Sequence, residues 1–501
     1  MCLLEHRWVQ RLAFPHRPQG LSACHPSIQV RKRGHSAHRY KPQSTVDIVE
    51  SSHPPIECHH SNRQGSARTS GQGEFGENMR GVSLGKMTSI HPVRVLCITL
   101  FFLCASCANL KMPHRVALPG PVANTDPIVL IHGFGGWGPN EMLGYRYWGG
   151  TVDLEEDLNT HGYPTVTATV GPVSSNWDRA CELYAQLIGA RVDYGAAHAK
   201  TFKHARYGVT YTKPLVPGWG KEGGPTIHLV GHSQGGQTAR VLASLLRYGA
   251  PEEMAAADNP SSLFAGGKSW IRSVTTLATP HDGTSLTHVM GDMLQLAQSI
   301  LVQVAGHAGI FPDKALFDFK LGQFGLAREK GESIRAYAKR AAKTSVFQTK
   351  DHAMWDLSPE GAKTLNMRYP EAPDVIYLSW STEATDPQGE KGHHAPEATM
   401  FLMFHGQSAD IGSYTANRKG HVPITPAWFQ NDGVVNTISM AGPTLGTQVP
   451  IQAFEGRVTP GIWHHMGILE STDHMDVVGV GTSTDIRPWF RHWATFLHRL
   501  P

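Results

Sequence analysis

The chain has 501 residues, a formal net charge of +4 and seven cysteines. Residues 1–86 carry 12 basic and 6 acidic side chains, and the rest of the chain carries 33 basic and 35 acidic side chains. The charge of the main part therefore gives no support to a nucleic-acid partner, and with Cys181 as its only cysteine after residue 108 it cannot be a disulfide-stabilised scaffold.

The N-terminal segment differs in composition from the rest of the chain. Residues 1–86 are rich in His, Arg, Ser, Gly and Pro, which is typical of a disordered leader, and they are either a genuine extension or upstream translation. Arg94, the apolar run 95–103 and the small residues 105–108 indicate a signal peptide that covers residues 87–108. A linker at 109–125 would follow. This pattern predicts a secreted protein, with a membrane anchor through residues 93–108 as the alternative.

From residue 126 to 501 the chain alternates apolar runs with helical patterns. Residues 127–131, 226–230, 274–278 and 375–380 are typical of strands that are buried on both faces. Helical patterns cover residues 179–189 and 234–247. This alternation predicts an α/β fold, in which a mostly parallel sheet is covered by helices on both faces.

A candidate nucleophile stands between the second predicted strand and the helix that follows it. Gly231-His232-Ser233-Gln234-Gly235 matches the pattern G-x-S-x-G, in which a serine occupies a tight strand-to-helix turn. The pattern is short, and it also matches residues 81–85 around Ser83, where no apolar strand precedes the serine. We therefore predict Ser233 as the nucleophile and reject Ser83.

Acyl transfer at a serine also requires donors for an oxyanion, a base and an acid. The expected donors are the backbone N–H of Gln234 and that of Phe134, which lies in the glycine-rich loop 132–136 after the first strand. A simple tight turn is the other interpretation of this loop.

In α/β-hydrolase-type serine enzymes, the triad acid and then the histidine follow the serine along the chain. Asp432 and His474 satisfy that order at turns next to apolar runs, although order alone does not exclude other acids and histidines.

Long segments of the chain resemble the zinc-containing thermoalkaliphilic bacterial lipases, from about Asp126 to the C-terminal region. The segments that carry the resemblance are residues 147–150, 171–182, 192–199, 232–240, 278–284, 431–437 and 473–474. The resemblance implies an α/β-hydrolase fold with Ser233 as nucleophile, Asp432 as acid and His474 as base.

The resemblance also implies two metal sites. The family's zinc ligands correspond to Asp178, His198, His204 and Asp282. Four protein ligands indicate a structural zinc ion, held partly by an insertion before the nucleophile strand. At the family's calcium site Asp476 is retained, but Gly481 and Thr482 stand where the family has an Asp-Pro pair. Because calcium needs six to eight oxygen ligands, we expect calcium to bind weakly or not at all.

Residues 286–311 correspond to the family's lid helices. The segment has aliphatic residues at helical spacing and one charged side chain, Asp292. A core helix is one interpretation, and a lid that exposes its apolar face at a lipid surface is the other.

Together these features predict a secreted triacylglycerol lipase that acts at a lipid–water interface, with no nucleic-acid partner and no obligate protein partner. A carboxylesterase or acyltransferase with the same triad is the alternative. An inactive α/β-hydrolase that serves as a binding module is the third possibility, and the intact set of Ser233, Asp432 and His474 argues against it.

Overall fold

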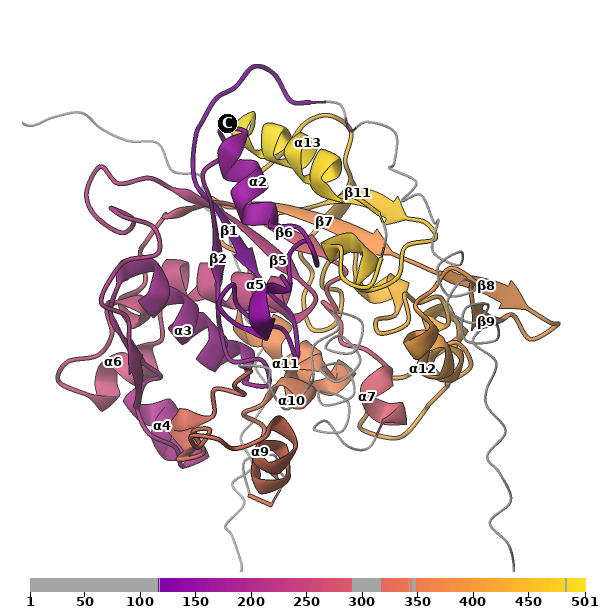
Figure 1. The fold of residues 1–501 in the computed structure, drawn as a ribbon, viewed down its shortest axis with the longest axis horizontal. Helices are drawn as coiled ribbons and strands as arrows, with labels where there is room; N and C mark the ends of the chain where they lie inside the picture. The colour runs from indigo at the N-terminus through magenta and orange to yellow at the C-terminus, as the bar shows by residue number, and fades with distance from the viewer. Residues whose placement is uncertain (1–115, 117, 291–316, 342, 345–347, 483) are drawn as a thin grey trace, which may run out of the picture. The chain divides into compact units, whose positions relative to one another are not determined.

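The structure, a computed structural model, describes residues 116, 118–290, 317–341, 343–344, 348–482 and 484–501 (Figure 1). The predicted leader with Ser83, the predicted signal peptide and most of the predicted lid lie outside the described residues. None of the helices within the described ranges has both the length and the apolar character that crossing a membrane requires.

A seven-stranded sheet forms the centre of this part of the chain, with the strand order β10-β11-β7-β6-β5-β1-β2. Every neighbouring pair in it is parallel. The strands are β1 (Ile128–Ile131), β2 (Thr165–Ala168), β5 (Ile227–His232), β6 (Ile271–Leu277), β7 (Ile376–Thr382), β10 (Ile451–Ala453) and β11 (Trp463–Leu469). The four predicted strands correspond to β1, β5, β6 and β7, which are adjacent in the sheet. The sequence patterns did not predict β2, β10 or β11.

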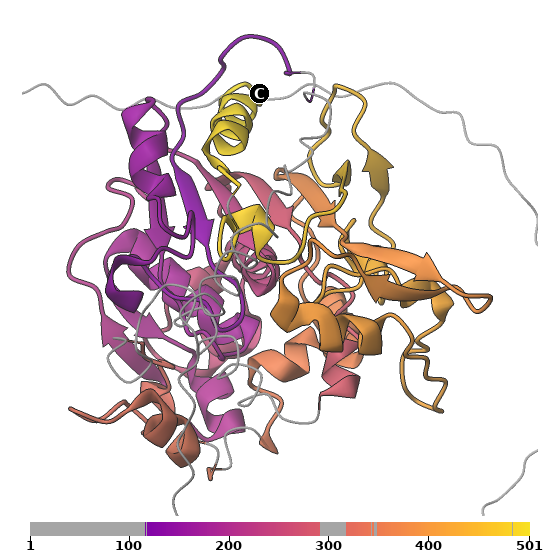
Figure 2. The same cartoon turned by 45° about the vertical axis from the view of Figure 1, so that its right-hand side comes forward.

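Side chains that alternate along the central strands enter two different hydrophobic cores. In β1, Ile128 and Leu130 pack in the core that includes residues of α2 (Leu154–Thr160) and α13 (Arg487–His498). Val129 and Ile131 pack in the core that includes α3 (Asn176–Ile188) and α5 (Gln234–Tyr248). Both faces of the sheet are therefore covered by helices, as predicted. Figure 2 shows the yellow α13 beside the violet α2, and the two helices are in contact.

Shorter elements surround the sheet. Within the described residues, the other α-helices are α4 (Ala196–Phe202), α6 (Pro251–Ala256), α7 (Leu286–Val289), α9 (Ile334–Ala341), α10 (Ala353–Leu357), α11 (Pro359–Arg368) and α12 (His405–Ile411). Two antiparallel pairs lie outside the main sheet: β3 (Arg191–Asp193) with β4 (Tyr207–Thr210), and β8 (Thr385–Gln388) with β9 (His393–Pro396). The pair β3–β4 and helix α4 form the insertion between α3 and β5.

Candidate active site and metal centre

Ser233 lies at the strained turn between β5 and α5. Its φ of 56° and ψ of −130° are rarely adopted by a residue with a side chain, and such a conformation costs about 1–3 kcal/mol. A Cβ atom on Gly231 would lie 2.4 Å from the backbone of Gly235, and a Cβ atom on Gly235 would lie 2.2 Å from the carbonyl oxygen of Ile131. The two glycines of the motif are therefore required by close approach of the backbone.

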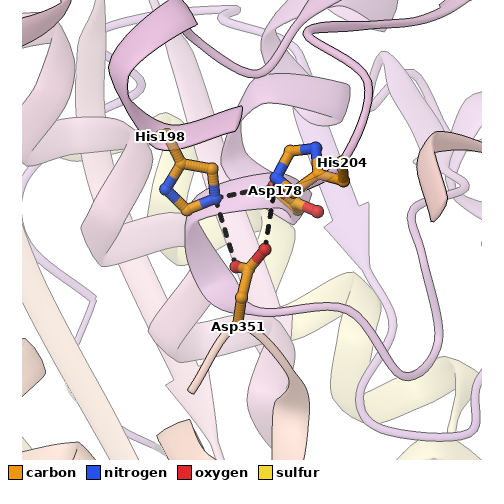
Figure 3. Close-up of side chains that lie close together, drawn as sticks. All are labelled: Asp178, His198, His204 and Asp351. Atoms are coloured by element: carbon orange, nitrogen blue, oxygen red, sulfur yellow. Dashed lines mark ion pairs between the residues drawn. The ribbon is translucent and has the colours of Figure 1, made fainter. Parts of the chain in front are cut away.

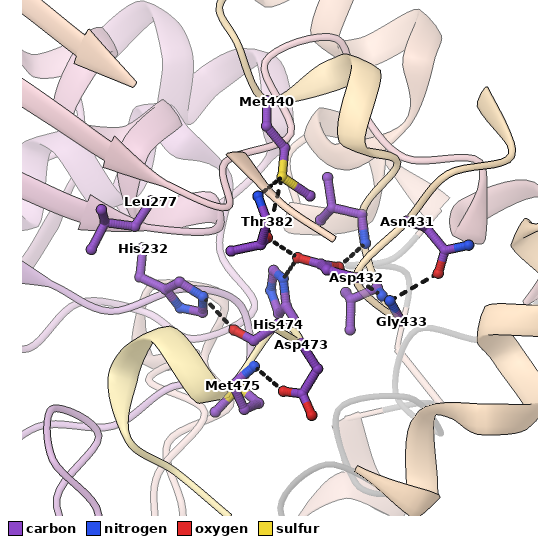
Figure 4. A network of polar contacts seen from close by, with 12 residues as sticks. His232, Leu277, Thr382, Asn431, Asp432, Gly433, Met440, Asp473, His474 and Met475 are labelled. Carbon is purple, nitrogen blue, oxygen red and sulfur yellow. Dashed lines mark hydrogen bonds and ion pairs between the residues drawn. The ribbon is translucent and has the colours of Figure 1, made fainter. Parts of the chain in front are cut away.

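The structure brings the predicted acid and base together (Figure 4). His474 Nδ1 lies 2.8 Å from Asp432 Oδ2, and the Thr382 hydroxyl donates to the same oxygen at 2.7 Å. The other carboxylate oxygen, Oδ1, accepts the backbone N–H groups of Val434 at 3.0 Å and Val435 at 2.8 Å. The fully buried carboxylate is thus held in one orientation, and a His474 imidazole that donates from Nδ1 keeps Nε2 available as a base.

Ser233 and His474 line the same apolar cavity, whose empty space of about 650 Å³ is partly open to solvent. Its other lining side chains are mostly apolar and include Phe134, Trp137, Leu286, Met354, Leu357, Phe404, Val434 and Met475. An apolar cavity with a few converging polar groups is typical of a small-molecule site. Here those polar groups are a nucleophile and a base, so the site can perform acyl transfer on an apolar substrate.

The glycine-rich loop after β1 packs directly against the nucleophile. A Cβ atom on Gly133 would lie 2.6 Å from Ser233 Cβ. The next residue, Phe134, lines the cavity, and its N–H donates to no acceptor within the part of the chain that the structure describes. Gln234 is the first residue of α5, where an N–H has no partner inside the helix. The two predicted oxyanion donors therefore flank Ser233.

A buried arginine anchors this loop to the helices behind it. The Arg179 guanidinium donates to the carbonyl oxygens of His132 and Gly171 and to the Thr238 hydroxyl. Burial lowers the pKa of Arg179 to about 10, so that the group is still charged at neutral pH. Charge-assisted hydrogen bonds to backbone oxygens hold the loop in place.

A second polar cluster brings together side chains from α3, the insertion and the segment before α10, and Figure 3 shows these side chains close to one another. It consists of Asp178, His198, His204 and Asp351. His198 Nε2 lies 3.3 Å from Asp178 Oδ1 and 3.2 Å from Asp351 Oδ1, and His204 Nε2 lies 3.3 Å from Asp351 Oδ2. One nitrogen or oxygen atom of each residue lies within 4.8 Å of the corresponding atoms of the others. This geometry could hold a metal ion.

The hydrogen bonding of the cluster supports a metal. Four atoms are buried without a hydrogen-bond partner: Asp178 Oδ1, His198 Nε2, His204 Nε2 and Asp351 Oδ2. The other polar atoms are held by the protein, since Gln323 donates to Asp178 Oδ2 at 3.0 Å and Ser175 donates to Asp351 Oδ1 at 2.6 Å. His204 Nδ1 lies 2.9 Å from the Ala205 carbonyl oxygen, which leaves Nε2 as the ligand atom. Two imidazoles and two carboxylates fit the preferences of Zn²⁺.

The two carboxylates of the cluster also shift the pKa of His198. Burial lowers the pKa of His198, but the adjacent Asp178 and Asp351 carboxylates outweigh this effect and raise it to about 9. Burial and the charge of Asp351 raise the pKa of Asp178.

Asp282, the predicted fourth metal ligand, lies outside this cluster, and Asp351 stands in its place. The Asp282 carboxylate accepts the backbone N–H groups of Thr444 and Leu445, each at 2.9 Å, and the amide of Asn366 at 3.2 Å. These donors, together with the Thr444 hydroxyl, come from other segments of the chain and satisfy the Asp282 carboxylate away from the cluster. Asp351 has no motif or local spacing that could have identified it from the sequence.

Asp476, the remaining carboxylate of the predicted calcium site, is occupied by contacts within the protein. It accepts the backbone N–H of Asp473 at 3.1 Å, and the Asp473 carboxylate in turn accepts the N–H groups of Phe401, Met475 and Asp476. Burial raises the pKa of Asp476 well above its usual range, and the charge of Asp473 raises it further.

We therefore expect added calcium to change the melting temperature by less than about 2 °C, because weak binding contributes little free energy to the folded state. Thermal unfolding with and without millimolar calcium measures this, with magnesium at the same concentration as the control for ionic strength. A rise of many degrees with calcium alone would show that the site is retained.

Comparison with known proteins agrees with this architecture. Residues 124–500 match the family model described as "Lipase-like, C-terminal domain". A protein named Lipase 1 from Staphylococcus aureus is 36% identical over 384 residues, which cover 75% of this chain and 54% of that protein. The chain thus spans about half the length of the curated relatives it matches.

Two solved structures share the fold at higher identity. EstA from Clostridium botulinum is 45% identical with a TM-score of 0.73, and the match covers 78% of this chain and 92% of that chain. Lipase 1 from Pelosinus fermentans is 45% identical with a TM-score of 0.70, and the match covers 76% of this chain and 100% of that chain. The predicted α/β-hydrolase fold and the resemblance to bacterial lipases are confirmed, while the identity of the metal stays a prediction. The family model matches well over half of the residues of this chain, and the chain therefore belongs to the lipase-like C-terminal domain family.

Proposed function

We propose that the chain is a lipase, a serine hydrolase that cleaves carboxylic esters of lipids through Ser233, His474 and Asp432. The observation that carries the proposal is the apolar cavity lined by both Ser233 and His474, with the His474 ring held by Asp432. The names of the Staphylococcus aureus and Pelosinus fermentans proteins also support it.

In the proposed reaction, Ser233 Oγ attacks the ester carbonyl while His474 Nε2 accepts the hydroxyl proton. The buried Asp432 carboxylate keeps the imidazole in the required tautomer and stabilises its charged form. The N–H groups of Phe134 and Gln234 donate to the oxyanion as the tetrahedral intermediate forms. His474 then delivers the proton to the leaving alcohol, and water repeats the sequence on the acyl-enzyme.

The proposal that the substrates are lipids is supported by the apolar walls of the cavity and by the place where the predicted lid begins. Leu286 and Thr287, the first residues of the short helix α7, line the cavity. The chain from residue 291 to 316 lies outside the described residues, so the lid itself stays a proposal. A cover that starts at the cavity wall is well placed to control access from a lipid–water interface.

We further propose that the protein is secreted and that the cluster of Asp178, His198, His204 and Asp351 holds a structural zinc ion. Secretion is supported by the signal-like pattern of residues 87–108 alone. The four protein ligands leave no open coordination position, and a zinc ion held by them would supply a structural cross-link. The residues themselves connect α3, the insertion and the segment before α10, three parts of the chain that are distant in sequence.

Hydrolysis of p-nitrophenyl esters of increasing chain length tests the lipase proposal. We expect emulsified long-chain esters to be hydrolysed at least as well as dissolved short-chain esters, because the cavity that contains Ser233 is apolar. Met354→Trp, which adds volume to the cavity wall, should reduce activity on long-chain esters several-fold more than on short-chain esters.

Met367→Trp is the matched control, because Met367 lies on α11 with 65% of its surface exposed and should affect neither class of ester. A strong preference for short dissolved esters, together with an equal effect of Met354→Trp on both classes, would favour the carboxylesterase alternative.

A further inference from the structure

A row of hydrogen bonds joins the two loops on either side of the nucleophile. The row starts at the backbone N–H of Gly133, which donates to the Tyr147 hydroxyl at 2.9 Å. The Tyr147 hydroxyl lies 2.6 Å from His232 Nδ1, and His232 Nε2 lies 2.9 Å from the carbonyl oxygen of His474. Figure 4 shows this last contact. Gly133 belongs to the oxyanion loop, and His232 immediately precedes Ser233.

The chemistry of these groups permits one arrangement of protons. Because a backbone N–H can only donate, the Tyr147 oxygen accepts from Gly133 and directs its own proton to His232 Nδ1. His232 then carries its proton on Nε2 and donates it to the His474 carbonyl oxygen. A charged imidazole would have two donors and would leave the Tyr147 hydroxyl proton without an acceptor.

The surroundings keep His232 in this neutral form. The His232 and Tyr147 side chains are buried, with their ring centroids 5.7 Å apart, and the His232 ring lies 4.7 Å from the His474 ring. Burial keeps the pKa of His232 well below its usual range, and the neighbouring His474 lowers it further. A neutral imidazole is therefore the stable species over the whole physiological pH range.

We propose that Tyr147 and His232 are positioning residues that hold the oxyanion loop and the backbone of the catalytic histidine at a fixed separation across Ser233. This inference rests on the proposed serine hydrolase function and assigns a role to two residues that do not belong to the triad. Neither residue acts on the substrate chemically in this proposal. Both act through Gly133 and His474.

The topology of the sheet explains why such a connection is needed. The oxyanion loop follows β1 and the His474 loop follows β11, and β5, β6 and β7 separate these two strands in the sheet. No backbone ladder therefore joins β1 to β11, and His232 at the end of β5 lies between the loops. A displacement of about 1 Å in a reacting group can reduce the rate about 100-fold, so a rigid link across the site affects kcat directly.

A double-mutant cycle in the full chain tests this inference. Tyr147→Phe removes one hydroxyl and disconnects the oxyanion loop, whereas His232→Asn keeps a short polar group near Nδ1 and removes the donor to His474. Each variant should lose roughly tenfold to 100-fold in kcat for a p-nitrophenyl ester with KM within about twofold, since positioning acts on the reacting groups. The double variant should lose about as much as the more damaged single variant, because either change already breaks the link.

His228→Asn is the matched control. His228 is equally buried in the same strand, β5, but its ring contacts Ser273 Oγ at 2.8 Å and Asn124 Oδ1 at 3.0 Å, away from the nucleophile. The His228→Asn variant should keep kcat within about twofold of the wild type, because substitutions remote from the site do not move the reacting groups. Thermal unfolding confirms that each variant is folded, and if His232→Asn fails to fold, Tyr147→Phe alone decides the question.

The inference is overturned if Tyr147→Phe and His232→Asn both keep the kcat of the wild type while activity still requires Ser233. It is also overturned if the two losses multiply in the double variant, since independent packing defects would then explain them. Failure of the proposed function would look different, because Ser233→Ala would then hydrolyse the ester as fast as the wild type. That result would overturn both proposals.

Discussion

Ser233→Ala should reduce kcat for ester hydrolysis by roughly four to six orders of magnitude while the protein remains folded. The alanine keeps the backbone of the elbow and removes only the hydroxyl that would form the acyl-enzyme. Replacing Ser233 removes no hydrogen bond from the Asp432–His474 pair, whose contacts come from Thr382, Val434 and Val435. Initial rates on a short-chain p-nitrophenyl ester, together with a thermal unfolding curve, measure both parts of this prediction.

Two serines serve as controls for this experiment. Ser83→Ala tests the other match to the nucleophile motif and should have no effect on the rate. Ser244→Ala changes a buried serine in α5, the helix that starts directly after Ser233, and should keep at least half of the activity. If Ser233→Ala keeps a tenth or more of the wild-type rate, Ser233 is not the nucleophile.

Asp351→Asn should abolish stoichiometric zinc binding and lower the melting temperature by about 5 °C or more. The substitution preserves the shape of the side chain but replaces a negatively charged ligand with a neutral amide. The other three ligands would then face one another in a buried site, where an uncompensated charge costs about 3–5 kcal/mol. Elemental analysis should find about one zinc ion per chain in the wild type and far less in the variant.

Asp282→Asn distinguishes the proposed metal site at the cluster in the structure from the site that the sequence predicted. This variant weakens the hydrogen bonds to Thr444 and Leu445, so it should lower the melting temperature but keep the full zinc content. Loss of zinc from Asp282→Asn with retention of zinc by Asp351→Asn would reverse the assignment. A wild-type protein without metal and with unchanged stability after chelation would show that the cluster is not a structural zinc site.

The strands that could be predicted from the sequence are those with apolar surroundings on both faces of the sheet. β1, β5, β6 and β7 are apolar along their length because helices cover both of their faces. β11 contains His464, His465 and Gly467, and its partner β10 has exposed residues, so neither has an apolar run that a sequence pattern would detect. Their place in the sheet depends on pairing with β7, which is a long-range contact.

The candidate active site likewise contains residues that local sequence patterns predict and residues that only long-range contacts place. Ser233 and its glycines are a local feature, since the strained turn requires small residues at fixed positions along the chain. Asp432 and His474 were favoured by their order and by the resemblance, but nothing in the spacing between them shows that the Asp432 carboxylate meets His474 Nδ1. The contribution of Thr382 to that pair comes from β7, and no local pattern pointed to it.

The sequence by itself determined the fold class, the elbow serine and three of the four residues of the cluster that could hold a metal ion, because each of these depends on short-range patterns or on long matching segments. Only the tertiary structure decided that Asp351 replaces Asp282 in the cluster and that Tyr147 and His232 connect the two loops beside Ser233. The physical reason is that hydrogen bonds and metal ligation depend on where buried atoms meet in space. Asp282 and Asp351 are chemically identical carboxylates, and they differ only in whether backbone donors or two imidazoles surround them.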